Sequence, residues 1–363
     1  MNLDLEKIDA NFKVETAVGE KDVVFYDVKN APFDLYGFYS PHTEQGFKRL
    51  PDEIGLSVNE GVSVLYLNSA GGRVRFCTDS QYIAIRAEMS RVYYRPHMTL
   101  ISSAGFDLYI DSPESCGSRF YDVFKPSIGI ENGFESKVVF NDRKLRYITI
   151  NFPSYSSVTS LKIGISNGSI LGSGLKYRDS MPIVYYGSSI TQGACSSRPG
   201  NAFPNIISRR TNTDFINLGF SGSAKGEESI SRYMADLPMS IFVCDYDHNS
   251  PNAAELERTH LQMYKIIRKK NPSVPYIMIS KPDFNKRYYQ DSVNRRNAVY
   301  NVYHEAISEG DKNVYFIDGS GIFRNINEDM CTVDTTHPND YGFYLMAEAI
   351  ESELRWIWSR AGI

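Results

Sequence analysis

Two short segments of this sequence carry residue types suited to nucleophilic chemistry. The first is Gly187-Ser188-Ser189-Ile190-Thr191-Gln192-Gly193, and the second is Asp334-Thr335-Thr336-His337-Pro338-Asn339. A serine hydroxyl is a weak nucleophile at neutral pH and needs an adjacent base, which a histidine can supply. An aspartate three residues before that histidine can accept a hydrogen bond from its ring. This bond fixes the tautomer and leaves the other ring nitrogen free as the base.

Taken alone, each segment also has a simpler interpretation. The glycines that flank the first segment would suit phosphate binding, but no Lys precedes a Ser or Thr, which excludes a P-loop. Thr191 stands where the second glycine of a G-x-S-x-G elbow should be, which excludes that motif. Ser189 is then either a nucleophile at a helix start or a helix N-cap, and a cap is the commoner role. Asp334 to His337 alone equally fits a solvated capping loop.

The composition is typical of a globular protein and excludes several classes of function. Of 363 residues, 42% are apolar and 23% are charged, which excludes a mostly disordered chain. The formal net charge of −4 provides no basic field for nucleic acid. No apolar run approaches the ~20 residues of a membrane span. The N-terminus has no basic segment followed by an apolar one, so we expect a cytoplasmic protein, unless the sequence is a trimmed form of a secreted one.

The cysteines predict no disulfide framework and no zinc site. Their number is odd, their positions are scattered, and they form no C-x-x-C pair. We therefore expect free thiols in a reducing compartment. The five are Cys77, Cys116, Cys195, Cys244 and Cys331.

The first half of the chain, residues 1–175, is expected to be an all-β domain. Short runs rich in Val, Ile, Tyr and Phe alternate with Gly, Asn, Asp, Ser and Pro, a pattern that predicts an antiparallel sandwich or jelly roll. A Gly- and Ser-rich stretch, residues 169–180, is predicted to connect the two domains. The expected strands are 23–28, 62–67, 74–77, 83–87, 106–110, 138–140, 147–152 and 161–165.

The second half, residues 176–363, alternates compact apolar runs with stretches of helical period. Five strands alternating with five helices predict a doubly wound parallel sheet. Ligands bind at the carboxyl ends of the strands in such sheets, so functional residues are expected in the loops that follow the strands. The expected strands are 183–186, 215–218, 241–244, 276–279 and 314–317, and the expected helices are 203–210, 230–237, 253–270, 293–307 and 341–358.

Considered together, the two chemical segments belong to a larger pattern, which resembles the SGNH (GDSL-like) hydrolase family over residues 181–360. Four segments match the family's blocks in the right order. The resemblance implies a flavodoxin-like, three-layer α/β/α catalytic domain. The preceding β domain resembles the N-terminal β-sandwich of two-domain members that are similar to carbohydrate acetylesterases. The matching segments are Gly187 to Thr191, Asn217-Leu218-Gly219-Phe220-Ser221-Gly222, Asp247-His248-Asn249-Ser250, and Asp334 to His337.

The resemblance assigns a role to each matching residue. It implies that Ser189 is the nucleophile, His337 the general base and Asp334 the residue that orients the histidine. The oxyanion would receive hydrogen bonds from the backbone N–H groups of Ser189 and Gly222 and from the side-chain amide of Asn249. No metal or cofactor is required by such a mechanism.

This sequence departs from the family pattern in two places. Ser188 stands where the family name implies Asp, but this position does not carry the nucleophile. In the third block the family has Gly-x-Asn-Asp, whereas Asp247 and Ser250 replace the Gly and the second Asp here. The oxyanion amide is therefore assigned to Asn249 by register, with Asn252 as the alternative.

Other residues near these blocks are weaker candidates. Arg198 follows the nucleophile segment and would contact substrate or form a structural ion pair. His248 is a second candidate for substrate contact. Asp245, Asp247 and His248 together resemble a metal cluster, but they offer too few ligands and the family uses none. Cys195 is expected to be a buried thiol.

These observations lead to a functional hypothesis with two alternatives. We expect a serine esterase that hydrolyses short-chain, acetyl, esters on carbohydrate. A lysophospholipase or thioesterase would use the same site, and a glycan-binding protein with a lapsed site is the third possibility. The expected partner is a small-molecule or oligosaccharide ester, with no nucleic acid and no membrane. A fold alone does not choose among these activities.

Overall fold

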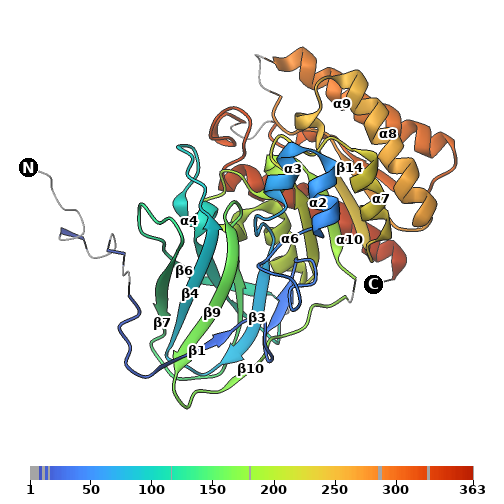
Figure 1. Cartoon of the computed structure of the whole chain (residues 1–363). Helices are drawn as coiled ribbons and strands as arrows, with labels where there is room; N and C mark the ends of the chain where they lie inside the picture. Colours follow the sequence, from blue (N-terminus) through green and yellow to red (C-terminus); the bar gives the residue numbers. More distant parts are fainter. Residues whose placement is uncertain are drawn as a thin grey trace, which may run out of the picture.

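The computed structural model describes residues 8–9, 13–14, 17–115, 117–179, 181–284, 288–324 and 328–362. The first half of the chain forms two antiparallel sheets, and the second half forms a parallel sheet between helices (Figure 1). This arrangement confirms the predicted fold class, a β-sandwich followed by a doubly wound α/β sheet.

The two antiparallel sheets pack face to face around one apolar core. Strand β4 contributes to this core through alternate positions of its sequence. The buried residues are Ile83, Ile85, Ala87 and Met89. One sheet has the order β1-β9-β4-β7, and the other has the order β10-β3-β8-β5-β6 with β2 paired to β3. The strands are β1 (Val23–Asp27), β2 (Asp34–Tyr36), β3 (Arg73–Thr78), β4 (Tyr82–Arg91), β5 (Phe106–Asp111), β6 (Ser118–Phe124), β7 (Gly133–Val139), β8 (Arg146–Asn151), β9 (Ser157–Ser166) and β10 (Leu171–Ser173).

Two expectations for this half were wrong. The run predicted as a strand over 62–67 is helix α3 (Glu60–Leu65), which follows α2 (Asp52–Val58). The side chain of Asn59 caps α3 by accepting a hydrogen bond from the backbone N–H of Val62, 2.9 Å away. A short apolar run cannot be assigned to strand or helix by its period. The predicted connection over 169–180 also contains a strand, β10.

The parallel sheet has the order β12-β11-β13-β14-β15, which is the flavodoxin-like order. Its order reverses beside β11, so the carboxyl ends of β11 and β13 flank the topological switch point, where ligands bind in such sheets. All five strands lie where the sequence predicts them. They are β11 (Ile183–Gly187), β12 (Phe215–Gly219), β13 (Ile241–Asp245), β14 (Tyr276–Ile279) and β15 (Val314–Ile317).

Helices cover both faces of this sheet and bury two separate apolar clusters. Residues of α7, α8 and α9 pack on one face, and residues of α6 and α10 pack on the other. The α-helices are α4 (Leu100–Ala104) in the first half and α5 (Ser189–Gln192), α6 (Phe203–Thr211), α7 (Glu228–Asp236), α8 (Ala253–Lys270), α9 (Tyr289–Ser308) and α10 (Asp340–Ala361) in the second.

Two buried arginines join the halves of the chain. Arg49 donates hydrogen bonds to the backbone carbonyls of Asn217 and Gly219 at β12, 3.0 and 2.7 Å away. Arg73 forms an ion pair with Asp214, and its guanidinium lies 3.8 Å from the centroid of the Phe215 ring. Buried carbonyls need such donors, so the two halves share an ordered interface.

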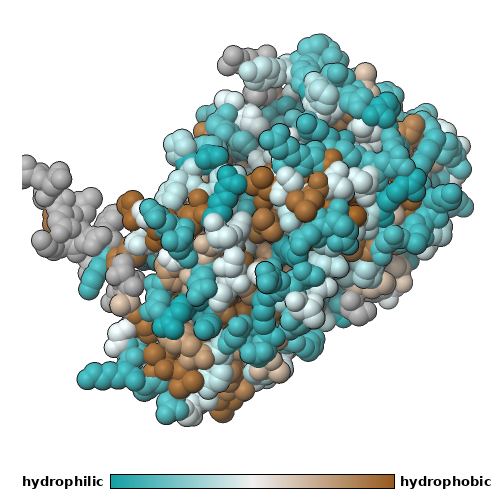
Figure 2. Space-filling model, viewed as in Figure 1, coloured by the Kyte–Doolittle hydropathy of each residue, from teal (hydrophilic) through white to brown (hydrophobic). Residues whose placement is uncertain are grey.

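The surface matches the composition. On the face shown in Figure 2, hydrophilic side chains cover most of the helical half, and hydrophobic residues gather at the lower end of the β half. Within the described ranges, no helix is both long and apolar enough to span a membrane. Cys77, Cys195 and Cys244 are buried free thiols. Cys331 is buried as well. Cys116 lies outside the described residues.

Candidate active site

Ser189 lies at the carboxyl end of β11, as the first residue of the short helix α5. The chain turns sharply here, and Gly187 allows it, because a Cβ at this position would lie 2.0 Å from Thr191 Oγ1. The Ser188 hydroxyl caps the helix by accepting a hydrogen bond from the N–H of Ile190. The cap is thus Ser188 and not Ser189, the alternative that the sequence left open, and the N–H of Ser189 has no partner within the helix.

His337 lies in a tight loop before α10, and Asp334 shapes that loop. One carboxylate oxygen of Asp334 accepts hydrogen bonds from the backbone N–H groups of Thr336 and His337, at 3.2 and 2.8 Å. The loop closes through a bond from the N–H of Val333 to the carbonyl of His337, 2.9 Å away. Hydrogen bonds to its backbone therefore fix the position of His337 independently of the contacts that its ring makes.

The three side chains form a continuous hydrogen-bonded chain. Ser189 Oγ lies 2.8 Å from His337 Nε2, and His337 Nδ1 lies 2.7 Å from Asp334 Oδ2. Burial raises the pKa of Asp334, but the hydrogen bonds from the backbone and ring of His337 outweigh it, so the pKa is lowered overall. An ionised Asp334 can stabilise an imidazolium, as nucleophilic attack by Ser189 requires.

The residues assigned to the oxyanion hole meet at the turn after β12, which a hydrogen bond from the N–H of Phe220 to the carbonyl of Gly187, 2.8 Å away, joins to the Ser189 segment. Gly222 follows β12 in a turn with a φ of 66°, a conformation that favours glycine. Asn249 Nδ2 donates a hydrogen bond to the carbonyl of Phe220, 3.0 Å away, which places this amide at the same turn. An amide nitrogen carries two hydrogens, so one remains for a ligand. Asn252 instead caps α8, because its side chain accepts from the N–H of Glu255 at 2.9 Å.

Two positioning residues that the sequence analysis missed hold these loops together. Gln192 Oε1 accepts a hydrogen bond from the N–H of Ser221, 3.0 Å away, and its Nε2 donates to the carbonyl of Ser154 in the β half. Asp340 accepts from the N–H of Ser197 at 2.8 Å, which ties the segment after the nucleophile to the start of α10. The sequence offered one signal for each: Gln192 is a polar residue inside the Gly187 to Gly193 segment, and Asp340 is an acid at the start of a predicted helix.

A cavity of about 500 Å³ opens beside His337, and both halves of the chain line it. Tyr155 comes from the β half, and its hydroxyl lies 3.5 Å from the carbonyl oxygen of Ser189. The His97 ring stacks on the His337 ring, with centroids 5.9 Å apart. The lining residues are Glu60, Gly61, Val64, Leu65, Arg91, Tyr93, Arg95, His97, Met98, Tyr155, Ala194, Ser221, Ser223 and His337.

Neither Arg198 nor His248 belongs to the described residues that line this cavity. Arg198 Nε lies 3.5 Å from the buried carboxylate of Asp107, and its guanidinium stacks on the Phe120 ring. His248 Nε2 lies 3.0 Å from Asp283 Oδ1. Each side chain instead lies beside a buried acid that needs a cationic partner, which for Arg198 is the alternative expectation. Contact with substrate stays a prediction for both residues.

The acidic cluster lies behind the turn that carries Ser189. Burial and the neighbouring Asp247 together raise the pKa of Asp245 to about 7. The carbonyl of Asp245 accepts from the N–H of Ser188 at 2.9 Å, and its carboxylate accepts from the Thr191 hydroxyl at 3.2 Å. Asp247 accepts from the N–H of Lys281 at 2.7 Å. These contacts make the cluster a support for the nucleophile turn.

Among the described residues, one group of four has ligand atoms that lie close enough together to hold a metal ion, within 4.8 Å of one another. It consists of His97, Cys195, Asp334 and His337, so it shares two residues with the hydrogen-bonded chain. Burial and the Asp334 carboxylate raise the pKa of Cys195 to about 12, which disfavours a thiolate there. A metal at this point would compete with the bond between Ser189 and His337.

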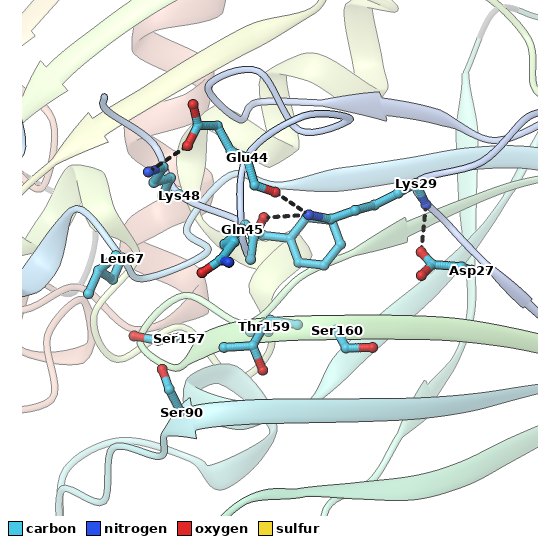
Figure 3. A pocket seen from close by; sticks show the side chains of 13 residues that line it. Asp27, Lys29, Glu44, Gln45, Lys48, Leu67, Ser90, Ser157, Thr159 and Ser160 are labelled. Carbon is cyan, nitrogen blue, oxygen red and sulfur yellow. Dashed lines mark hydrogen bonds and ion pairs between the residues drawn. The ribbon is translucent and has the colours of Figure 1, made fainter. Parts of the chain in front are cut away.

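A second large pocket, of about 570 Å³, lies on the β half (Figure 3). Both lysines that line it already have partners within the protein. Lys29 Nζ donates to the carbonyls of Glu44 and Gly46, and Lys48 pairs with Glu44 and Asp52 at 2.7 and 2.6 Å. No group suited to nucleophilic catalysis lies beside a base among the described residues that line it. The cavity beside His337, whose ring lies 2.8 Å from Ser189 Oγ, is therefore the candidate active site.

Family models match both halves of the chain. Residues 180–355 match the GDSL-like lipase/acylhydrolase family, and residues 23–171 match the N-terminal domain of SGNH-hydrolase-type esterases. No curated protein gives a significant sequence match.

Solved structures share the whole arrangement. A putative GDSL-like lipase from Bacteroides ovatus is 28% identical, with 93% of this chain and 98% of that chain covered and a TM-score of 0.83. A salicylyl-acyltransferase from a tetracycline biosynthetic pathway is 17% identical over 93% and 98% of the chains, with a TM-score of 0.74. An acetyl xylan esterase from Butyrivibrio proteoclasticus is 12% identical over 93% and 99%, with a TM-score of 0.55. The last two, at such identities, show a shared fold alone.

Proposed function

Because the chain belongs to the GDSL-like, SGNH-type esterase family, we propose that it is a serine esterase that removes acetyl groups from carbohydrate. The observation that carries this proposal is the hydrogen-bonded chain from Ser189 through His337 to Asp334, at the edge of a polar cavity. Serine, base and orienting acid in this order are the groups that acyl transfer requires.

The proposed reaction begins when Ser189 Oγ attacks the ester carbonyl carbon. His337 Nε2 removes the hydroxyl proton as the Oγ–carbon bond forms. The N–H groups of Ser189 and Gly222 and the amide of Asn249 donate hydrogen bonds to the oxyanion. The tetrahedral intermediate then breaks its bond to the sugar oxygen, and His337 returns the proton to that oxygen. Water, deprotonated by His337, then attacks the acetyl carbon. The Oγ–carbon bond breaks, acetate leaves, and His337 returns the proton to Ser189 Oγ.

The lining of the cavity supports a polar substrate. Most of its side chains are charged, hydroxylated or aromatic, and these groups suit sugar hydroxyls and sugar faces better than a lipid tail. Tyr93 and Tyr155 offer rings of the kind that stack on sugars. A structural neighbour is named as an acetyl xylan esterase, which agrees with the proposed substrate class.

The first experiment is hydrolysis of 4-nitrophenyl acetate and 4-nitrophenyl octanoate by the protein and by Ser189→Ala. We expect turnover of the acetate that disappears in the variant. Preference for octanoate would favour the lysophospholipase or thioesterase alternative. No turnover of either ester by folded protein would favour a glycan-binding protein, and would overturn the proposal.

A further inference from the structure

The end of β4 and the loop that follows it present four large side chains to the candidate active site. Arg91 is the last residue of β4, Tyr93 and Arg95 follow it, and His97 lies in the turn beyond them. All four line the cavity beside His337. Two arginines therefore face the site from the β half, a feature that the proposed acetyl transfer does not use.

Both guanidiniums are held against one ring. Arg91 lies 4.6 Å from the centroid of Tyr93, and Arg95 lies 4.9 Å from it. Arg95 also donates to the carbonyl of Tyr94. Stacking of this kind orients a guanidinium and leaves much of its planar fork of donors available for a ligand.

These two charges have no acidic partner in the part of the chain that the structure describes. Neither Arg91 nor Arg95 has a described carboxylate within ion-pair distance, and Glu60 is the one acid among the described residues that line the cavity. The pocket of Figure 3 is different, because Lys48 there is neutralised by Glu44 and by an aspartate. In a chain whose net charge is −4, the active-site cavity is thus locally cationic.

We propose that Arg91 and Arg95 bind a carboxylate of the substrate, so that the preferred ester is an acetylated uronic acid residue of a glycan. This proposal rests on the proposed esterase function. Arginine binds carboxylates with two parallel hydrogen bonds, which gives both affinity and orientation. The carboxylate belongs to the sugar and not to the acyl group, because both arginines are exposed whereas Ser189, which holds the acyl carbon, is buried.

The test compares two substrates that differ at one group. Acetate release is measured from an acetylated methyl glucuronoside and from the same acetylated methyl glucoside, which has a CH₂OH group in place of the carboxylate. We expect kcat/KM to be about 10-fold or more higher for the glucuronoside, mainly through KM, since a hydrogen bond to a charged group has this effect. High salt should reduce the ratio, because the arginines are exposed.

Variants assign the effect to the two arginines. The double variant Arg91→Gln and Arg95→Gln should bring the ratio of the two kcat/KM values close to one. Arg86→Gln is the matched control: Arg86 lies on the same strand, stacks on Phe25 and pairs with Glu135, but does not line the cavity. The control should keep the ratio of the unchanged protein.

Other outcomes separate the two proposals. Equal rates on both sugars would overturn the uronate proposal and leave the esterase. Preference for 4-nitrophenyl hemisuccinate over 4-nitrophenyl butyrate, without preference for the glucuronoside, would move the carboxylate to the acyl group and overturn it too. If no ester is hydrolysed, binding of methyl glucuronoside to the protein is measured by calorimetry. Binding lost in the double variant would uphold the arginine site while the esterase fails, and no binding would overturn both.

Discussion

The two halves of the molecule contribute different things to one cavity. The α/β half supplies the proposed nucleophile, base, orienting acid and oxyanion donors, each from a loop near the carboxyl end of a strand or the start of a helix. The β half supplies Arg91, Tyr93, Arg95, His97 and Tyr155 as a wall. In the proposed function, the reacting groups therefore come from a fold common to many enzymes, and the groups proposed to choose a substrate come from a neighbouring sandwich.

The electrostatics of the halves differ in the same way. Behind the nucleophile, the acids Asp245 and Asp247 are buried and their pKa values are raised by burial. On the wall from the β half, arginines are exposed to the cavity. Buried charges next to the reacting groups shape the turn that holds Ser189, and exposed charges remain available to a ligand. Changes in the first region should alter rate or stability, and changes in the second should alter specificity.

Removal of the nucleophile should have the largest effect. Ser189→Ala should reduce kcat by about 10⁵-fold or more, because His337 then has no hydroxyl to activate. The free energy of unfolding should stay within ~1 kcal/mol, since the side chain is small. Ser63→Ala, at a half-buried serine of α3 outside the cavity lining, is the control and should retain full activity. Substantial turnover by Ser189→Ala would place the chemistry elsewhere.

The next prediction separates the two asparagines. Asn249→Ala should lower kcat by about 10²- to 10³-fold, as loss of an oxyanion donor does. Asn252→Ala should leave kcat unchanged and lower the free energy of unfolding by about 1 kcal/mol, because it removes the cap of α8. Steady-state kinetics and urea denaturation of both variants measure these effects. The reverse pattern would assign the oxyanion amide to Asn252.

A smaller effect is expected at Arg198, where a variant should show whether the side chain stabilises the fold or contacts the substrate. Arg198→Gln should lower the free energy of unfolding by about 1–3 kcal/mol, because it removes the ion-pair partner of the buried Asp107 carboxylate and leaves only the field of Arg209. KM for a neutral acetyl ester should not change, since Arg198 does not line the cavity. A large rise in KM with unchanged stability would show that this side chain reaches the substrate.

The smallest effect concerns pH. The pKa of Asp245 is raised from its usual 3.8 to about 7, so between these values the folded state holds a proton that the unfolded state has lost. Stability contributed by this group should therefore fall as pH rises from about 4 to about 7. Asp245→Asn should make the decrease in Tm over this range smaller. Asp107, whose pKa is raised to about 6, acts in the same direction in both proteins. Identical pH slopes for the two proteins would argue against a protonated Asp245.

Much of the catalytic half could be predicted from the sequence. All five strands of the parallel sheet and the helices α6 to α10 have strong periods, and the loops after them carry recognisable blocks. The β half was harder. Helix α3 resembles a strand in composition, but the side chain of Asn59 caps its first turn and so favours a helix. Strand β10 lies in a Gly-rich stretch whose pairing with β3 depends on distant residues.

The sequence by itself determined the order of the elements in the α/β half and pointed to the proposed reacting groups, because local period and short motifs depend on neighbouring residues. It also left Arg198 and His248 as candidates for substrate contact, because a sequence does not show which distant residue will pair with a side chain near a motif. Only the tertiary structure decided their partners, since Asp107 and Asp283 approach them through folding. It also decided the wall of the cavity. Arg91 and Arg95 precede Ser189 by about a hundred residues, and only the packing of the sandwich against the α/β half places them beside it.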